Sequence, residues 1–237
     1  DASKSRGLGD VYKRQRLSYY TNITLIGVDE VGRGSWAGPI VATACWIDFN
    51  NYKLMHPDIN DSKKLKVNKR REIVNSLNNA VKYSTAISTQ KEIDFYGLTF
   101  ANNLAMKRSI FLLIEVLNRS FSDTADKVHI YVDGKYKPNF SKVEITLEEK
   151  KKLKLKSNHI IPLTKGDNKS KTIALASIIA KETRDSIMRN YSLKYPLYHF
   201  DKNVGYGTFN HKNAISNYGI TKIHRKSFKP ISTIYSK

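Results

Sequence analysis

The sequence contains one cysteine, Cys45, and no apolar run long enough to cross a membrane. A single cysteine excludes an intramolecular disulfide framework and a cysteine metal cluster. Its place inside an apolar, strand-like stretch favours a core residue over a nucleophile. Neither a secretory signal nor a lipidation motif is evident. We therefore expect a cytoplasmic protein with no membrane partner.

Acidic residues are scarce. The chain of 237 residues has 21 Asp and Glu against 41 Lys and Arg, a formal net charge of +20. Such an excess favours a polyanionic partner, most often nucleic acid, with an anionic membrane surface as the competing choice. The hydrophobic fraction of 40% is typical of a globular protein, and the length suffices for one large domain with a real core.

Strand-like and helix-like segments alternate along the chain, which predicts an α/β fold with a mixed sheet. Residues 1–16 resemble adaptor sequence, and we expect a tail there that is not necessarily native. We expect a catalytic domain over 17–195 and a packed helical and loop extension over 196–237. The predicted strands are 23–28, 40–47, 83–89, 128–134 and 160–163. The predicted helices are 68–82, 92–118 with a break near 96–97, and 170–194.

The first apolar run, Ile23 to Val28, stops at two adjacent acids, Asp29 and Glu30. Unpaired buried carboxylates are costly, so a positive partner is expected beside them. Adjacent strand residues point to opposite faces. Both acids therefore serve one site only if the pleat breaks at Asp29 or if one residue contributes its carbonyl. The alternative is an ordinary hairpin in which both are solvated turn residues.

Two further apolar runs also lead to acids, Asp133 and Asp167. Sites in α/β sheets form where neighbouring strands end, so Asp29 and Asp133 are expected to converge. Clustered carboxylates need a counter-charge, and Mg²⁺ or Mn²⁺ prefers such oxygen ligands. The alternatives are a plain turn at Asp133-Gly134 and a helix cap at Asp167. For Asp185, the default is an ion pair with Lys181, one helical turn away on a solvated face.

At this point the motifs resemble a known family. GVDEVGRG, DSKKL, YVDG, KGDNKSKTIALASIIAKETRD, GYGT and HRKSF occur in the order and approximate spacing of ribonuclease HII, from Ile23 to about Pro230. The resemblance implies a ribonuclease H-like fold with a central mixed five-stranded sheet flanked by helices and a small C-terminal helical part. It also implies a monomer that cleaves the RNA strand of RNA/DNA hybrids and incises on the 5′ side of single ribonucleotides in duplex DNA, leaving 5′-phosphate and 3′-hydroxyl ends.

The resemblance also assigns roles to residues. It implies two divalent ions, Mn²⁺ or Mg²⁺, held by the acidic quartet Asp29, Glu30, Asp133 and Asp167, with Asp185 as a further metal-associated acid. The turn Gly32-Arg33-Gly34 would sense the ribose 2′-hydroxyl, and Tyr206 would pack on the nucleotide that follows the ribonucleotide. Lysines at three motif positions would lie near phosphates, unless they are exposed lysines with no special role: Lys63, Lys165 and Lys181.

Other functions remain open at this stage. A non-catalytic basic nucleic-acid-binding protein would use the acids as caps and turns, and an enzyme of the same fold could act on a different nucleic acid. The sister class, ribonuclease HIII, has a similar core but normally carries an extra N-terminal domain and usually lacks the arginine of the GRG turn. The six histidines are scattered, and no two have metal-ligand spacing, which argues against zinc.

Overall fold

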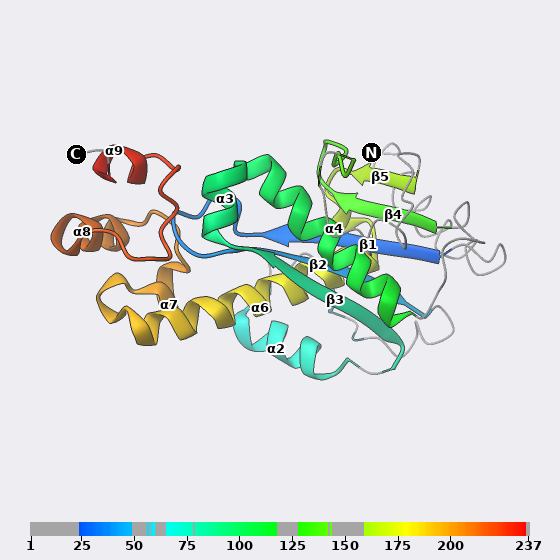
Figure 1. Cartoon of the computed structure of the whole chain (residues 1–237). Helices are drawn as coiled ribbons and strands as arrows, with labels where there is room; N and C mark the ends of the chain where they lie inside the picture. Colours follow the sequence, from blue (N-terminus) through cyan, green and yellow to red (C-terminus); the bar gives the residue numbers. More distant parts are fainter. Residues whose placement is uncertain are drawn as a thin grey trace, which may run out of the picture.

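The computed structural model describes residues 24–48, 56, 58–59, 65–77, 79–117, 128–141, 143 and 159–235. Within them, five strands form one sheet (Figure 1). The strands are β1 (Thr24–Val31), β2 (Ile40–Ile47), β3 (Val81–Ser88), β4 (Val128–Asp133) and β5 (Ile160–Leu163). The predicted strands over 40–47 and 160–163 match these bounds, and the others differ by a few residues.

The sheet is mixed, as the sequence predicts. Its strand order is β3-β2-β1-β4-β5. The pairs β1–β2 and β2–β3 are antiparallel, whereas β1–β4 and β4–β5 are parallel. The three parallel strands point toward the end of the molecule that carries the C-terminal helices (Figure 1). Their carboxyl ends therefore lie together, which is where α/β sheets place their sites.

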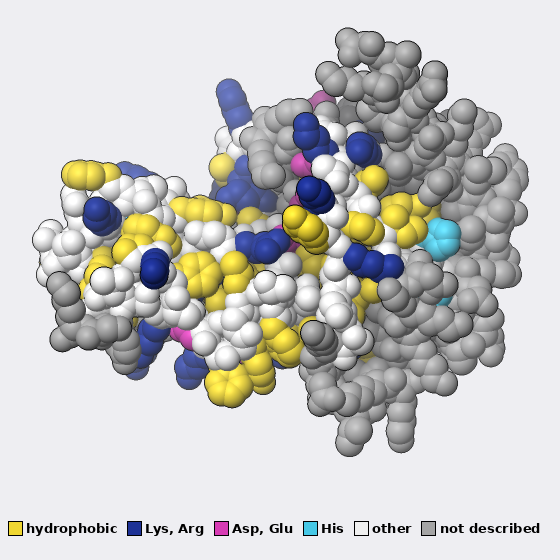
Figure 2. Space-filling view, turned by 90° about the horizontal axis from the view of Figure 1, so that it is seen from above, with side chains coloured by type: hydrophobic (Ala, Val, Ile, Leu, Met, Phe, Trp, Pro, Cys, Tyr) yellow, Lys and Arg dark blue, Asp and Glu magenta, His cyan; other side chains and the backbone are white. Residues whose placement is uncertain are grey.

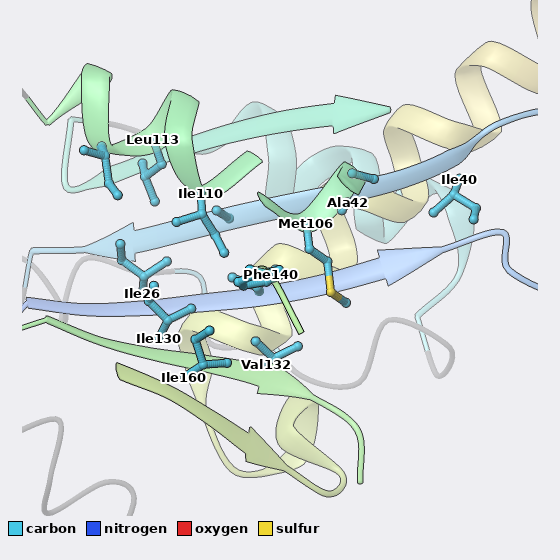
Figure 3. Packing of buried hydrophobic residues seen from close by; sticks show 14 of the residues in the cluster. Ile26, Ile40, Ala42, Met106, Ile110, Leu113, Ile130, Val132, Phe140 and Ile160 are labelled. Atoms are coloured by element: carbon cyan, nitrogen blue, oxygen red, sulfur yellow. The ribbon is translucent and has the colours of Figure 1, made fainter. Parts of the chain in front are cut away.

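Helices cover both faces of the sheet. One face packs against α4 (Leu98–Val116), whose Leu113 and Ile110 lie over the part of the central strands that carries Ile26, whereas Met106 lies farther along, over Val132 (Figure 3). The other face packs against α6 (Lys171–Lys194), with α2 (Val67–Asn75) beside it (Figure 1). Coverage on both faces explains why β1 is apolar on both sides of its pleat.

The helix α6 approaches the sheet closely. A β-carbon added at Gly27 of β1 would lie 2.5 Å from the backbone nitrogen of Ile173, so only glycine allows this contact. The small side chains of Ala174, Ala176 and Ala180 in α6 are buried, in keeping with the short distance between helix and sheet.

Two sequence predictions about element ends were wrong. The strand β1 does not stop before the acids: Asp29 pairs with Thr43 and Glu30 with Ala42, and the strand ends at Val31. The edge of β2 remains available as a hydrogen-bonding partner, so the pleat continues through both acids.

The helix predicted over 68–82 ends at Asn75, and Val81 already opens β3. A run rich in Asn and Ser follows the helix, and these residues compete with the helix for backbone hydrogen bonds. The break expected near Gly97 is confirmed, because α3 (Gln90–Tyr96) ends there and α4 follows, with φ of 81° at the glycine.

Beyond α6 the chain forms short helices: η5 (Pro196–Tyr198), α7 (Phe200–Asn203), α8 (Phe209–Tyr218) and α9 (Ile231–Tyr235). They share a small hydrophobic cluster that includes Phe200, Ile215 and Ile231, together with Ala37 from the β1–β2 connection and Met188 of α6. The division at residue 195 stays a prediction. Within the described ranges, every helix is too short or too polar to span a bilayer.

Candidate active site

Asp29 lies in β1 on the face covered by α6. It is 8% exposed. Burial raises the pKa of its carboxyl well above the usual range, and the neighbouring charges of Glu30 and Asp133 raise it further. A hydrogen bond from Ser177 of α6 and one from the backbone N–H of Glu30 oppose this rise. Asp29 is therefore a buried acid beside two like charges.

Glu30 has the opposite side-chain direction because the pleat is unbroken. Burial raises its pKa, as does Asp133, whereas Arg33 lowers it. The Nη1 atom of Arg33 lies 3.4 Å from Oε1 of Glu30. Glu30 and Asp133 line the same cleft of about 310 Å³, together with residues of α4 and the segment after β4. Asp133 at the end of β4 is thus the acid that interacts with both neighbours on β1.

The turn that carries Asp167 lies against Asp133. The backbone N–H of Gly166 donates to Oδ1 of Asp133 at 2.7 Å. Asp167 itself is buried, and its Oδ1 accepts from the backbone and side-chain amides of Asn168 at 2.9 and 3.1 Å. It is not the cap of α6, because the N-cap position belongs to Ser170.

Asp185 has different neighbours from the other acids. Its Oδ2 accepts from Arg70 of α2 at 2.8 Å, and its Oδ1 from Lys181 at 2.6 Å. The alternative expected from the sequence, an ion pair with Lys181, is therefore present, although Asp185 is buried and not on a solvated face. Its association with a metal stays a prediction.

The turn Gly32-Arg33-Gly34 follows β1, and a buried arginine holds it. Arg225 donates from Nη2 to the carbonyl of Gly32 at 2.6 Å and from Nη1 to that of Arg33 at 2.8 Å. The carbonyls are thus fixed toward the protein. Among the described residues, no atom accepts from the backbone N–H of Arg33 or Gly34, so these donors are available to a ligand.

A second buried arginine, Arg184 of α6, supports the same segment. It donates to the carbonyls of Pro39 and Ala37 at 3.0 and 3.1 Å and to the hydroxyl of Ser35 at 2.7 Å. A side chain at Gly32 would collide with it, and Gly32 has φ of 93°. Glycine is therefore required at Gly32 for two independent reasons.

Tyr206 lies next to this turn. Its ring centroid is 5.7 Å from the guanidinium carbon of Arg184. A β-carbon added at Gly34 would lie 4.0 Å from Cε1 of the same ring. The ring is 38% exposed, so it retains a free surface. The structure thus brings Tyr206 and the GRG turn together, although they are distant in sequence.

The three lysines fall in different surroundings. Lys63 lies outside the described residues. Lys165 is exposed beside the Asp167 turn, with φ of 56°. Lys181 bonds to Asp185. On the face seen in Figure 2, Lys and Arg side chains are more frequent than Asp and Glu, a few of which show between them.

The sequence prediction missed Arg184, the carbonyl contacts of Arg225 and a contact between His211 and His224. Arg184 lies four residues from Ala180 and from Met188, on the apolar face of its helix, and this position was the available signal. The motif HRKSF offers no such signal for the contacts of Arg225. For the histidines no such signal exists, because 13 residues separate them and their contact depends on the fold.

The fold and the cluster of acids define a nuclease of the ribonuclease H-like class. A ribonuclease H2 structure from Pyrococcus horikoshii OT3 matches with a TM-score of 0.60 and 26% identity, over 90% of this chain and 98% of that chain. A structure of Bst-RNase HIII in complex with Mn²⁺ matches with a TM-score of 0.65 and 18% identity, over 90% and 70%.

Sequence comparison gives the particular family. The family model "Ribonuclease HII" matches residues 26–231. The chain is 39% identical to a ribonuclease HII of Clostridium beijerinckii, covering 86% of this chain and 67% of the relative. A ribonuclease HII of Staphylococcus aureus is 37% identical, with 94% and 76% covered. The chain belongs to the ribonuclease HII family, and it is an endoribonuclease of RNA/DNA hybrids.

Proposed function

We propose that this ribonuclease HII hydrolyses phosphodiesters with two divalent ions bound at the quartet Asp29, Glu30, Asp133 and Asp167. The observation that carries the proposal is the burial of Asp29 beside two further acids, Glu30 and Asp133, and their charges together with burial raise its pKa. Like charges held together in this way favour a cation between them. Asp185 is not part of the proposed set, because Arg70 and Lys181 already neutralise it.

The donor set is suited to Mg²⁺ or Mn²⁺. It consists of the carboxylate oxygens of Asp29, Asp133 and Asp167 and, because the unbroken pleat turns the side chain of Glu30 to the other face, the backbone carbonyl of Glu30. Hard divalent cations prefer such oxygen ligands. Among the described residues, no group of three Asp, Glu, His or Cys side chains is already arranged to enclose an ion. Mg²⁺ sites usually include substrate phosphate oxygens, and the scissile phosphate would complete the coordination here. The Mn²⁺ in the RNase HIII structure supports the same chemistry.

In this proposal the protein positions the reacting groups. Divalent ions supply an activated water and stabilise the leaving oxygen when they are bound. Asp29 and Asp133 hold the centre of the site. Gly166 fixes one oxygen of Asp133 through its N–H, which limits how that carboxylate can turn. The expected products are 5′-phosphate and 3′-hydroxyl ends.

Recognition of the ribonucleotide is proposed at the GRG turn. The backbone N–H groups of Arg33 and Gly34 and the Arg33 side chain would test for the 2′-hydroxyl, which distinguishes RNA from DNA. Tyr206 would pack on the next nucleotide. The partners are thus RNA/DNA hybrids and ribonucleotide-containing duplex DNA, attracted by the basic surface.

A single cleavage assay, with the products separated on a gel, tests this function. Labelled duplexes with one ribonucleotide, with an RNA strand, and with DNA only are incubated with Mn²⁺ or with EDTA. We expect cleavage of the first two substrates, with incision 5′ of the ribonucleotide, and only with the metal. Binding without products in either condition would favour a non-catalytic binder. Cleavage of the all-DNA duplex would show that the enzyme does not require the 2′-hydroxyl.

A further inference from the structure

Two buried histidines contact each other next to the GRG turn. His211 in α8 is fully buried, and His224 is 2% exposed. Their Nε2 atoms are 3.0 Å apart. None of the roles proposed above involves them. We refer to them as the histidine pair.

The neighbours of the histidine pair determine where its protons lie. Nδ1 of His224 faces the backbone N–H of Thr221 at 2.8 Å, so this nitrogen must accept. The proton of His224 is then on Nε2 and is donated to Nε2 of His211. Nδ1 of His211 lies 2.9 Å from the carbonyl of Tyr206, which can only accept, so it carries the other proton. The contact with Thr221 and the contact with Tyr206 thus require the same pair of tautomers, and both imidazole rings are neutral.

An additional proton has no suitable place in this arrangement. On His211 it would bring two N–H groups face to face across 3.0 Å, and on His224 it would face the N–H of Thr221. Burial lowers the pKa of both histidines. For His224 the pKa falls to about 4, with the proximity of His211 as a further cause. The pair therefore stays neutral at neutral pH.

The packing around the pair is aromatic. The rings of Trp36 and Phe200 lie 5.7 and 5.3 Å from that of His211, and Tyr198 lies 5.5 Å from that of His224. The hydroxyl of Tyr198 is occupied, since it donates to the carbonyls of Tyr218 and Gly219.

Two arginines lie near the pair, and the acid Asp94 accepts from the backbone N–H groups of Lys226 and Ser227. Arg225 adjoins His224 in the chain, and Arg184 lies behind Tyr206; both are bonded to oxygens of the segment 32–39 or to the carbonyl of Val204. Among the described residues, no carboxylate forms an ion pair or hydrogen bond with either imidazole, so no counter-charge favours a positive charge there.

The pair connects the segments that form the wall of the substrate site. On one side, His211 bonds to the backbone of Tyr206. On the other, His224 forms a bridge with Ala37, and Arg225 donates its backbone N–H to the carbonyl of Trp36 at 2.8 Å. The segment 36–38 directly follows the GRG turn.

We propose that the histidine pair consists of positioning residues, in which the neutral imidazole of His211 holds the backbone of Tyr206 so that the tyrosine ring stays beside the GRG turn. The carbonyl of Tyr206 also accepts from the backbone N–H of Thr208 at 2.8 Å, so the imidazole supplies the second of two bonds. The inference rests on the proposed reading of the RNA-to-DNA junction by Tyr206.

Two substitutions of His211 distinguish a role in holding the backbone of Tyr206 from a role in core packing alone. His211→Asn keeps an N–H near the position of Nδ1 and can still donate to Tyr206, but it cannot reach His224. His211→Gln keeps a polar group near the position of Nε2 for His224, but it loses the bond to Tyr206. His129→Gln, at the opposite end of β4 from Asp133, is the control for an ordinary histidine replacement.

The first measurement is hydrogen–deuterium exchange of the amides in residues 203–208. We expect His211→Gln to raise exchange there by about tenfold, the effect of one lost hydrogen bond to a buried group, and His211→Asn to stay close to the wild type. Equal exchange in the two variants would overturn the proposal, because His211 would then be only a core residue.

The second measurement is the ratio of kcat/KM for single-ribonucleotide duplex to that for uniform hybrid. We expect His211→Gln to lower this ratio about tenfold, with a loss in the same direction for Tyr206→Ala, and His211→Asn to preserve it. Equal losses on both substrates in both histidine variants would overturn the proposal. If Tyr206→Ala leaves the ratio unchanged, junction reading by Tyr206 fails, and the exchange measurement still decides the positioning role.

Discussion

Two buried acids, Asp29 on the strand that faces α6 and Asp185 on α6 itself, have opposite environments. Asp29 is 8% exposed and Asp185 is 5% exposed, so both have lost most of their contact with water. Asp29 lies beside Glu30 and Asp133, which repel its charge. Asp185 is bonded to Arg70 and Lys181, which neutralise it. Burial alone therefore does not indicate which acid has a structural role and which is available to a ligand.

The difference is that Asp185 has cationic partners within the described residues, whereas the charges beside Asp29 are those of other acids. The ion pairs of Asp185 are satisfied within the chain and link α2 to α6. Within the part of the chain that the structure describes, the contacts that lower the pKa of Asp29 are hydrogen bonds from Ser177 and the backbone of Glu30. The energetic cost of such a cluster is relieved when a cation binds, which explains how the site can be destabilising for the free protein and yet suited to its function.

The largest effect is expected for Asp29→Asn in the cleavage assay. Loss of a central carboxylate removes several kcal/mol of metal-assisted stabilisation, so cleavage of a single-ribonucleotide duplex should fall by about a thousandfold or more. Hybrid binding should be largely retained, because the basic surface is unchanged. Asp201→Asn in α7 is the control. Full activity of Asp29→Asn would contradict the proposed ligand set.

The next effect is on stability, and it concerns Asp185→Asn. Removal of the Asp185 charge breaks the ion pair with Lys181 and leaves Arg70 with the longer contact to Glu182 at 4.0 Å. Breaking a buried pair costs about 3–5 kcal/mol. A chain of this size loses about 2–4 °C of Tm per kcal/mol, which thermal unfolding followed by circular dichroism can resolve. A raised Tm with lost cleavage would instead make Asp185 resemble Asp29 and return it to the metal site.

A smaller effect should follow from the metal alone. Mn²⁺ at about 100 times its Kd should stabilise the wild-type protein by about 2.7 kcal/mol. Thermal unfolding with and without Mn²⁺, without nucleic acid, measures this shift. Asp185→Asn should keep most of it and Asp29→Asn should lose most of it. The same shift in both variants would mean that the ion binds elsewhere.

The smallest effect is a pH dependence. Because the pKa of Asp29 is raised, the folded protein holds this proton more tightly than the unfolded chain does. The ionised form thus costs stability at neutral pH, and the cost disappears below the unfolded pKa of about 3.9. Without metal, Asp29→Asn should be more stable than the wild type at pH 8 by no more than a few degrees in Tm. The plots of Tm against pH for the two proteins should meet near pH 4. A difference in Tm that widens toward low pH would contradict the expected direction of the effect.

The sequence predicted the sheet and most of its elements because the apolar runs are short, continuous and separated by clear breaks. The two wrong element ends have different causes. Whether β1 continues through Asp29 and Glu30 depends on the partner strand β2, which cannot be read from the local pattern. The end of α2 coincides with a run rich in Asn and Ser, a local signal that the prediction did not use.

Some residues of the site were likewise predicted from the sequence, and others were not. An apolar run that ends in an acid led to Asp133. The resemblance to ribonuclease HII led to the GRG turn and to Tyr206, which the structure brings together. The sequence could not reveal that Arg70, 115 residues from Asp185 along the chain, neutralises that acid. The histidine pair and the carbonyl contacts of Arg184 and Arg225 likewise depend on segments that meet only after folding.

The close packing of α6 at Gly27 has a consequence for how this enzyme can vary. The same helix, 24 residues long, donates from Ser177 to Asp29, carries Lys181 and Asp185, and supports the turn through Arg184. A larger residue at position 27 would displace the whole of α6. Such a substitution would change the catalytic activity, the stability and the discrimination between ribose and deoxyribose at the same time, so selection on any one of these properties constrains the other two.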